Sequence, residues 1–160
     1  MTTIAAHGSE MAADTQCTSD YIGRVRKIHK LPDGTLVGGA GVQASVFAAI
    51  AWLYAGRQGE APDIENSGLL FLRPDGSIWL ADGRWPEFPV MGDHYAIGSG
   101  STAAMVAMHL GKSAAQAVRL RRCSMTALRR RSTHSNCPRG PHERNREGRG
   151  HHRAPARRCL

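Results

Sequence analysis

The hydrophobic pattern of this chain stops abruptly near residue 118, and this break limits what the chain can fold into. Residues 119–160 hold thirteen arginines and two glutamates, a net charge of +11. Residues 1–118 hold eight Lys or Arg and eleven Asp or Glu, a net charge of −3. A segment so rich in Arg, Pro, Gly and Ser buries too little apolar surface to offset its ordering entropy. We therefore predict one folded domain over residues 2–118 and a disordered tail over residues 119–160.

Several classes of protein do not fit this sequence. No apolar run approaches the ~18 residues that a membrane span needs, and no basic segment followed by an apolar one suggests a secretory signal at the N-terminus. We therefore expect a cytoplasmic protein without membrane contact. The four cysteines lack the Cys-x-x-Cys spacing of metal sites. We interpret them as free thiols, and we expect neither a bound metal nor a cofactor.

Short strand signals dominate the folded part. Pro-Asp-Gly between the apolar runs LLFL and SIWL is a strong hairpin signal, and Gly8 supplies a turn between two shorter segments. The alternation in YIGRVRKIHKL is weaker but typical of a strand. Strands are predicted at residues 2–6, 10–14, 21–31, 35–37, 69–72, 77–80, and from Tyr95 into a glycine-rich turn.

Helical spacing of apolar residues appears at two places later in the chain. It predicts a helix over residues 42–55 that ends at Gly56, and a second over residues 102–111 that ends at Gly111. Another helix begins after Ser113, a possible N-cap. Loops are predicted at residues 57–67 and 84–94. Strands in blocks followed by helices indicate an α+β fold, with helices layered on antiparallel sheets.

Thr2 is a candidate reactive group, because it follows Met1 directly and the first predicted strand begins there. Removal of Met1 is expected next to so small a residue, and it would give Thr2 a free α-amine beside its hydroxyl. An N-terminal threonine can act as nucleophile and base together, because its own amine takes the hydroxyl proton. An α-amine with a pKa of roughly 7.7–8.0 suits base catalysis near neutrality. The alternative is an ordinary first residue.

Other residues could complete such a site. Asp14 ends the second predicted strand, and Lys27 lies in the next one, where the two could orient and tune a hydroxyl. Gly41 precedes a helix, whose first N–H groups and dipole suit an oxyanion. Taken singly, Asp14 also fits a hairpin end and Lys27 a solvated strand position. Gly41 also fits a tight turn, and Ser99 a helix cap.

In their order along the chain, these residues resemble a known family. The stretches that carry the resemblance are TTIAA, AADTQ, VRKIHKL, LVGGAG and AIGSGSTAAMVAMHLGKSAAQAV. They resemble the proteasome β-type N-terminal-nucleophile hydrolases, above all the HslV-type peptidases and their short phage-encoded relatives, over roughly residues 2–118. The resemblance implies an αββα sandwich and peptide-bond hydrolysis through an acyl-enzyme. It also implies a homo-oligomeric ring and, for the HslV type, a ring ATPase that unfolds substrates.

The resemblance assigns roles position by position. Thr2 would be the nucleophile, with its own α-amine as the base. Lys27 would match the lysine that lowers the pKa of the reacting group, and Asp14 the aspartate that pairs with that lysine. Gly41 would match the glycine whose N–H lines the oxyanion hole. Ser99 would match the serine that hydrogen-bonds near the threonine amine.

The resemblance ends where the tail begins. Family members continue with further strands of one sheet, whereas residues 119–160 have the composition of an out-of-frame translation, which predicts a sandwich that is incomplete at its C-terminus. One alternative is therefore a catalytically inactive ring subunit or a truncated relative. Another is a polyanion or nucleic-acid binder, because thirteen arginines would bind phosphate non-specifically and more weakly as salt rises. The tail lacks aromatic residues for base stacking.

Overall fold

The computed structural model describes residues 2–18 and 22–120 of the chain. Its strands are β1 (Ile4–His7), β2 (Glu10–Ala13), β3 (Gln16–Thr18), β4 (Ile22–Arg24), β5 (Ile28–Lys30), β6 (Leu36–Gly41), β7 (Ser67–Leu72), β8 (Ile78–Asp82), β9 (Phe88–Pro89) and β10 (His94–Ile97). Its helices are α1 (Gln43–Tyr54) and α2 (Ser101–His109), and residues 114–120 are also helical.

The strands form two main antiparallel sheets and one small ribbon. One sheet has the order β10-β1-β2, and the other has the order β5-β6-β7-β8-β9. The ribbon pairs β3 with β4. In the smaller sheet Ile4 lies opposite both Ala13 and Ile97, so β1 is its central strand.

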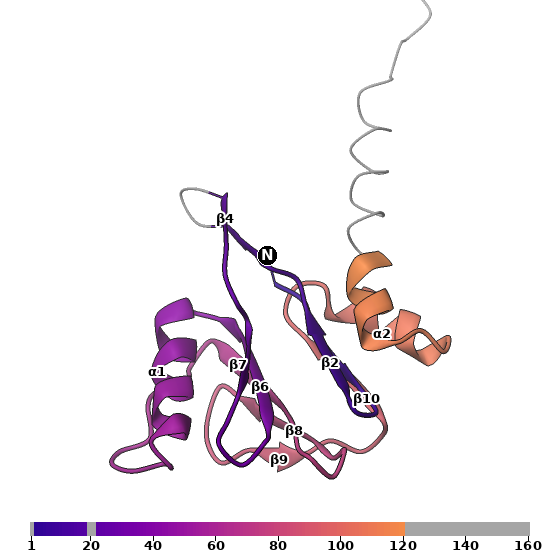
Figure 1. Cartoon of the computed structure of the whole chain (residues 1–160). Helices are drawn as coiled ribbons and strands as arrows, with labels where there is room; N and C mark the ends of the chain where they lie inside the picture. The colour runs from indigo at the N-terminus through magenta and orange to yellow at the C-terminus, as the bar shows by residue number, and fades with distance from the viewer. Residues whose placement is uncertain (1, 19–21, 121–160) are drawn as a thin grey trace, which may run out of the picture.

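The two sheets lie face to face between helices, and each of the three interfaces has its own apolar core (Figure 1). Helix α1 covers the outer face of the larger sheet. Helix α2 and residues 114–120 cover the outer face of the smaller one. The core between the sheets contains Ile4, Ala6, Leu70, Leu72, Ile78, Leu80 and Ile97. The fold is therefore an α+β sandwich with four layers in the order αββα.

Strand β7 shows how the sequence produces these layers. Successive side chains of a strand point to opposite faces. Leu69 and Phe71 pack in the core under α1, whereas Leu70 and Leu72 pack in the core between the sheets. A strand that is buried on both faces needs a continuous apolar run, and the sequence LLFL supplies it. The predicted helices and the hairpin of β7 and β8 are confirmed, with ends shifted by a few residues.

The glycines after residue 37 do not end a strand, as the sequence had led us to expect. They lie inside β6, which runs on to Gly41. A Cβ atom on Gly38 would lie 3.0 Å from the carbonyl oxygen of Lys27, and one on Gly39 would lie 2.3 Å from the Val46 side chain. These glycines therefore allow close approach of neighbouring segments, while the β6 backbone stays paired with β5 and β7.

The single strand predicted over residues 21–31 is also wrong in detail. It divides into β4 and β5, and residues 25–27 lie outside both strands. Strands β3 and β9 were not predicted. At the break, the Val25 N–H donates to the Thr15 carbonyl and the Lys27 ammonium group donates to Thr2 and Gln16, so residues 25–27 are held by the segments at Thr2 and at residues 15–16.

Several expectations concern residues outside the described part of the chain. These are the disorder and polyanion binding of the tail, and the free thiols Cys123, Cys137 and Cys159. Within residues 2–18 and 22–120, no helix is long and apolar enough to cross a membrane.

Candidate active site

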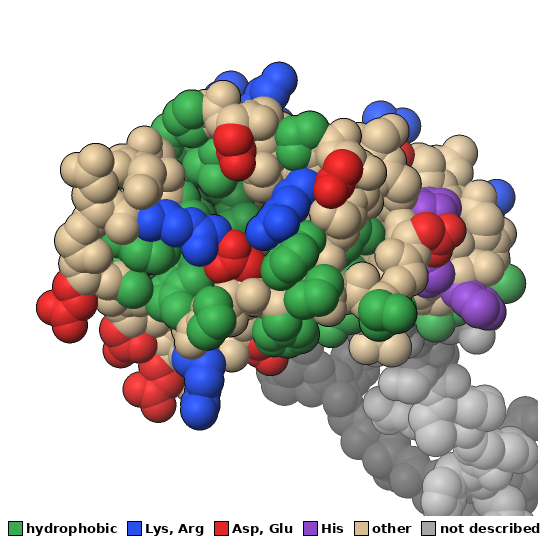
Figure 2. Space-filling view, turned by 90° about the horizontal axis from the view of Figure 1, so that it is seen from below, with side chains coloured by type: hydrophobic (Ala, Val, Ile, Leu, Met, Phe, Trp, Pro, Cys, Tyr) green, Lys and Arg blue, Asp and Glu red, His purple; other side chains and the backbone are tan. Residues whose placement is uncertain are grey.

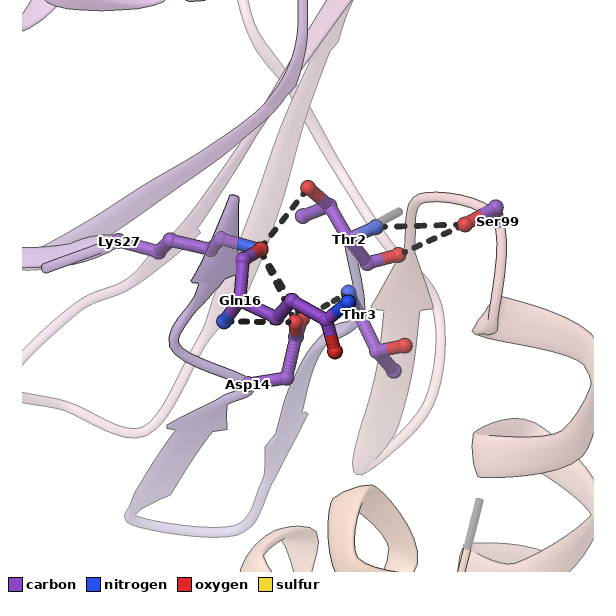
Figure 3. A network of polar contacts seen from close by, with 6 residues as sticks. All are labelled: Thr2, Thr3, Asp14, Gln16, Lys27 and Ser99. Carbon is purple, nitrogen blue, oxygen red and sulfur yellow. Dashed lines mark hydrogen bonds and ion pairs between the residues drawn. The ribbon is translucent and has the colours of Figure 1, made fainter. Parts of the chain in front are cut away.

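Thr2 lies just before β1, beside the turn that follows β10 (Figure 3). Its backbone nitrogen lies 3.3 Å from Ser99 Oγ, and its carbonyl oxygen accepts hydrogen bonds from Ser99 Oγ at 3.3 Å and from the Gly100 N–H at 3.4 Å. Gly98 has φ +88°, and a Cβ atom there would lie 2.4 Å from the Thr2 carbonyl oxygen. The turn can therefore hold Thr2 closely only with glycine at position 98.

The Lys27 ammonium group connects Thr2 to the interior of the site. Its Nζ donates to Thr2 Oγ1 at 3.0 Å, to the backbone oxygen of Gln16 at 2.6 Å, and to the Asp14 carboxylate at 3.1–3.2 Å. The Lys27 side chain is 7% exposed and that of Asp14 is 12% exposed. An ammonium group has three N–H donors, and three acceptor groups surround it here. Lys27 is therefore held in one orientation, with one donor on the threonine hydroxyl.

Asp14 is fixed in turn by the backbone. Its Oδ1 accepts the Thr3 N–H at 2.5 Å, and its Oδ2 accepts the Gln16 N–H at 3.2 Å. The Asp14 N–H bonds the Thr3 carbonyl at 3.0 Å, which continues the pairing of β1 with β2 by one more residue. Asp14 thus joins the start of β1 to Lys27, and its charge compensates that of the buried ammonium.

Gly41 reaches the same region from the opposite sheet. It is the last residue of β6, its φ is +119°, and a Cβ atom there would lie 2.3 Å from the Asn66 carbonyl oxygen. The Val42 N–H, at the N-terminus of α1, donates to Ser67 Oγ at 3.0 Å. Thr2, Gly41 and Ser99 all line one cavity of about 620 Å³. A carbonyl group bound there would lie beside a hydroxyl and a helix N-terminus.

All five predicted residues therefore lie in this region. Thr2, Asp14, Lys27 and Ser99 form one hydrogen-bonded network, and Gly41 meets Thr2 and Ser99 across the cavity. Sequence reasoning missed four residues that position them, namely Thr3, Gln16, Ser67 and Gly98. Gly98 stands inside the motif Ile-Gly-Ser-Gly and could have been found there. Gln16 gives no such signal, because its backbone carbonyl is the acceptor.

The Lys27 ammonium group forms an ion pair with the Asp14 carboxylate. No group of three or more His, Cys, Asp or Glu residues within residues 2–18 and 22–120 could hold a metal ion. The polar groups found around Thr2 are its own hydroxyl, the Ser99 hydroxyl, the Lys27 ammonium group, the Asp14 carboxylate and backbone groups.

The fold of this chain is similar to that of several solved structures. BPH of Thiobacillus denitrificans, in a complex with epoxomicin, superposes with a TM-score of 0.53 over 74% of this chain and 85% of that one, at 18% sequence identity. HslV of Trypanosoma brucei gives a TM-score of 0.55 over 73% of this chain and 86% of that one, at 20% identity. The chain has the proteasome-like fold of the N-terminal-nucleophile hydrolases.

A third structure with this proteasome-like fold is a Gly-1 mutant of Anbu from Hyphomicrobium sp. strain MC1. It gives a TM-score of 0.55 over 72% of this chain and 67% of that one, at 15% identity. No family model matches the chain, and no curated protein matches its sequence. The likeness is therefore one of fold, and the chemistry of the site has to be argued from the residues of this chain.

Proposed function

We propose that this chain is a threonine-type endopeptidase in which Thr2, freed of Met1, is the nucleophile. The observation that carries the proposal is the Lys27 ammonium group, 3.0 Å from Thr2 Oγ1 and paired with Asp14 in a largely buried position. Burial strengthens electrostatic interactions, so this cation stabilises negative charge that develops on the threonine oxygen. A surface lysine would contribute far less.

In the first half of the proposed reaction, the α-amine of Thr2 takes the hydroxyl proton as Oγ1 attacks the carbonyl carbon of a peptide bond. Lys27 keeps its proton and donates a hydrogen bond to Oγ1. The carbonyl oxygen becomes an oxyanion, and the N–H of Gly41 at the cavity wall is the proposed donor to it. The amine then returns its proton to the leaving nitrogen, the C–N bond breaks, and an ester on Thr2 remains.

In the second half, water attacks the ester carbonyl and gives its proton to the same amine. The C–O bond to Thr2 breaks, the acid product leaves, and the hydroxyl regains its proton. Ser99 Oγ, 3.3 Å from the Thr2 nitrogen, fixes the position of the amine during both halves. In this proposal Asp14 acts through Lys27, so it is a positioning residue.

We further propose that the chain assembles with copies of itself into a ring, as the resemblance implies, and that it acts in the cytoplasm. Phe47 and Tyr54 on α1 are 42% and 46% exposed, and Val42 before it is 48% exposed, so apolar surface is available for such contacts. Mass photometry of the purified protein measures this directly. We expect a multiple of the 17.3 kDa chain rather than a monomer. A ring ATPase partner stays a prediction.

Hydrolysis of internally quenched peptides tests the proposed activity. We expect wild-type protein to cleave such peptides and Thr2→Ala to lose at least ~1000-fold in rate, because the nucleophile is gone. Thr2→Ser keeps a hydroxyl beside the amine and should retain measurable cleavage. Cleavage that survives in Thr2→Ala, or folded wild-type protein that cleaves nothing, would refute the proposal. The second result would favour a catalytically inactive ring subunit.

A further inference from the structure

The cavity beside Thr2 has one charged side chain, that of Asp82, in an otherwise neutral wall of described residues. Most of its wall is neutral, with hydroxyl, amide and phenol groups among apolar side chains. Besides Thr2, the polar neutral residues of the wall are Asn66, Ser67, Tyr95, Ser99 and Ser101. Among the side chains of the described residues that line the cavity, that of Asp82 alone is charged, and none belongs to Lys, Arg or His. The α-amine of Thr2 acts as a base in its neutral form in the proposed reaction, so it adds no fixed positive charge.

Asp82 is placed at the cavity by the register of the larger sheet. It is the last residue of β8 and lies opposite Gly68 of β7. A Cβ atom on Gly68 would lie 3.6 Å from Asp82 Oδ1, so the carboxylate lies beside the bare backbone of β7. Gly83 follows with φ +69° and turns the chain away from the strand. The carboxylate is thus presented at the cavity without a neighbouring side chain across the strand pair.

The charge of Asp82 is not balanced by the cations nearby. Lys27, the cation at Thr2, has its ion pair with Asp14. Arg84 is exposed, and no ion pair joins it to Asp82 among those found in the described residues. A negative wall with no fixed counter-charge attracts cationic ligands and repels anionic ones.

We infer that the cavity selects peptides that carry an arginine or lysine side chain beside the cleaved bond, with Asp82 as the group that recognises it. The inference rests on the proposed peptidase function and names its substrate class. The cavity volume of about 620 Å³ leaves room for a long side chain. Because Asp82 is exposed, its effect is that of a surface ion pair, about 3- to 5-fold in kcat/KM.

The test uses full-length protein and pairs of quenched peptides that differ in one residue. One peptide of each pair has arginine and the other has citrulline, which is close to arginine in shape but carries no charge. The pair is made with the varied residue before the cleaved bond and again with it after the bond. We expect arginine to be favoured about 3- to 5-fold on at least one side, and the ratio to fall as salt rises.

Three variants make the test specific. Asp82→Asn should bring the arginine-to-citrulline ratio to about one. Asp82→Lys should favour glutamate over glutamine in a matched pair. Glu65→Gln removes an exposed carboxylate from the segment next to Asn66 without touching the cavity wall, and it should leave the ratio unchanged. Thermal unfolding of each variant shows whether it is folded.

The outcomes distinguish failure of the arginine or lysine preference from failure of the peptidase function. Cleavage by wild-type protein without arginine preference, or a preference that persists in Asp82→Asn, overturns the inference and leaves the peptidase function standing. Loss of the preference in Glu65→Gln as well as in Asp82→Asn also overturns it, because the effect would then come from general charge. Absence of any cleavage by folded wild-type protein overturns both the inference and the proposed function.

Discussion

Two partly buried clusters of ion-paired side chains lie in different parts of this fold, and they differ in which partner is buried and in what the cation contacts. Lys27 is 7% exposed and pairs with Asp14, and its remaining donors reach Thr2 Oγ1 and a backbone oxygen. Glu87 is also 7% exposed and pairs with Arg57 and Arg73, which are 44% and 38% exposed. Both clusters bury a charge. Only the first directs a cation at a hydroxyl.

The second cluster is built around aromatic rings. The Arg73 guanidinium lies 3.7 Å from the ring centre of Trp79, and Arg57 lies 5.7 Å from Trp52 and 5.9 Å from Trp85. Basic and acidic side chains also lie next to each other among apolar ones on the face shown in Figure 2. Cations that stack on tryptophan and share one carboxylate join loops to the core. The buried cation of the first cluster faces a reactive hydroxyl, whereas the buried carboxylate of the second is shared by two half-exposed cations, so the first arrangement serves reaction and the second serves stability.

The largest expected effect is the loss of cleavage when the Lys27 ammonium group is removed. Lys27→Met should slow peptide cleavage by about 100- to 1000-fold, because the threonine oxygen loses its electrostatic partner. It should also lower the free energy of unfolding by about 3 kcal/mol, because Asp14 stays buried without its cation. Cleavage kinetics and urea unfolding measure the two effects. Cleavage within a few-fold of wild type would contradict the role of Lys27.

A double variant sharpens this result. Lys27→Met combined with Asp14→Leu removes both charges, and replacing a buried pair with apolar residues is often neutral for stability. We expect the double variant to recover much of the unfolding free energy and none of the activity.

The second prediction concerns the tryptophan cluster. Glu87→Ala should lower the free energy of unfolding by about 1–2 kcal/mol, because two half-exposed guanidinium groups lose their shared carboxylate but stay solvated. Cleavage by the folded variant should change less than about two-fold, since distant sites act independently. Urea unfolding and steady-state kinetics at a temperature where the variant is folded check this. A large loss of activity in folded Glu87→Ala would show that the two clusters are coupled.

The third prediction is smaller and concerns the wall opposite Thr2. Ser67 is 4% exposed, and its hydroxyl holds the Val42 N–H beside Gly41. Ser67→Ala should lower kcat about 3- to 10-fold with little change in KM, because a looser Gly41 binds the oxyanion less well. Thr35→Val, at a buried threonine just before the first residue of β6 and at the opposite end of that strand from Gly41, is the control and should leave kcat unchanged. An equal loss in both variants would indicate a general packing effect.

The smallest expected effect is a pH dependence of stability. Burial raises the pKa of Glu87, but the hydrogen bond from Arg57 and the charges of Arg57 and Arg73 outweigh it, so that its pKa lies below the ordinary 4.5. A carboxyl with a lowered pKa in the folded state stabilises above the ordinary value and loses this contribution as pH falls through the lowered one. Stability should therefore fall below about pH 4.5.

Comparison with Glu87→Gln isolates that contribution. The difference in unfolding free energy between wild type and Glu87→Gln should shrink as the pH is lowered. Asp33 and Asp75 add to the acid loss in both proteins, because hydrogen bonds from Thr35 and Ser77 lower their pKa values. A difference that stays constant down to pH 3 would contradict the charged state of Glu87 as its source.

Much of the fold was predictable because its signals are local. The apolar run of β7, the Pro-Asp-Gly turn and the helical spacing in α1 each follow from short-range rules. The course of β6 through its glycines was not predictable in this way. It depends on Lys27 and Val46, which approach from other segments.

The residues of the site likewise differ in how well the sequence predicts them. Thr2, Asp14, Lys27 and Gly41 were proposed from their residue types and order, and the resemblance added the role of Ser99. Ser67 and Gln16 were missed because each acts through a contact over a distance in sequence, one by its hydroxyl on Val42 and one by its carbonyl on Lys27. The incomplete sandwich and the disorder of the tail concern residues 121–160, which lie outside the described part of the chain, and both stay predictions.

The most direct test of a nucleophilic Thr2 is mass spectrometry of the intact protein and its peptides after treatment with epoxomicin, the ligand of the BPH structure. We expect the N-terminal peptide to begin at Thr2, without Met1, and to carry one inhibitor molecule that is absent in Thr2→Ala. Folded protein with an unmodified Thr2, or an adduct that persists in Thr2→Ala, would contradict the nucleophilic role of Thr2.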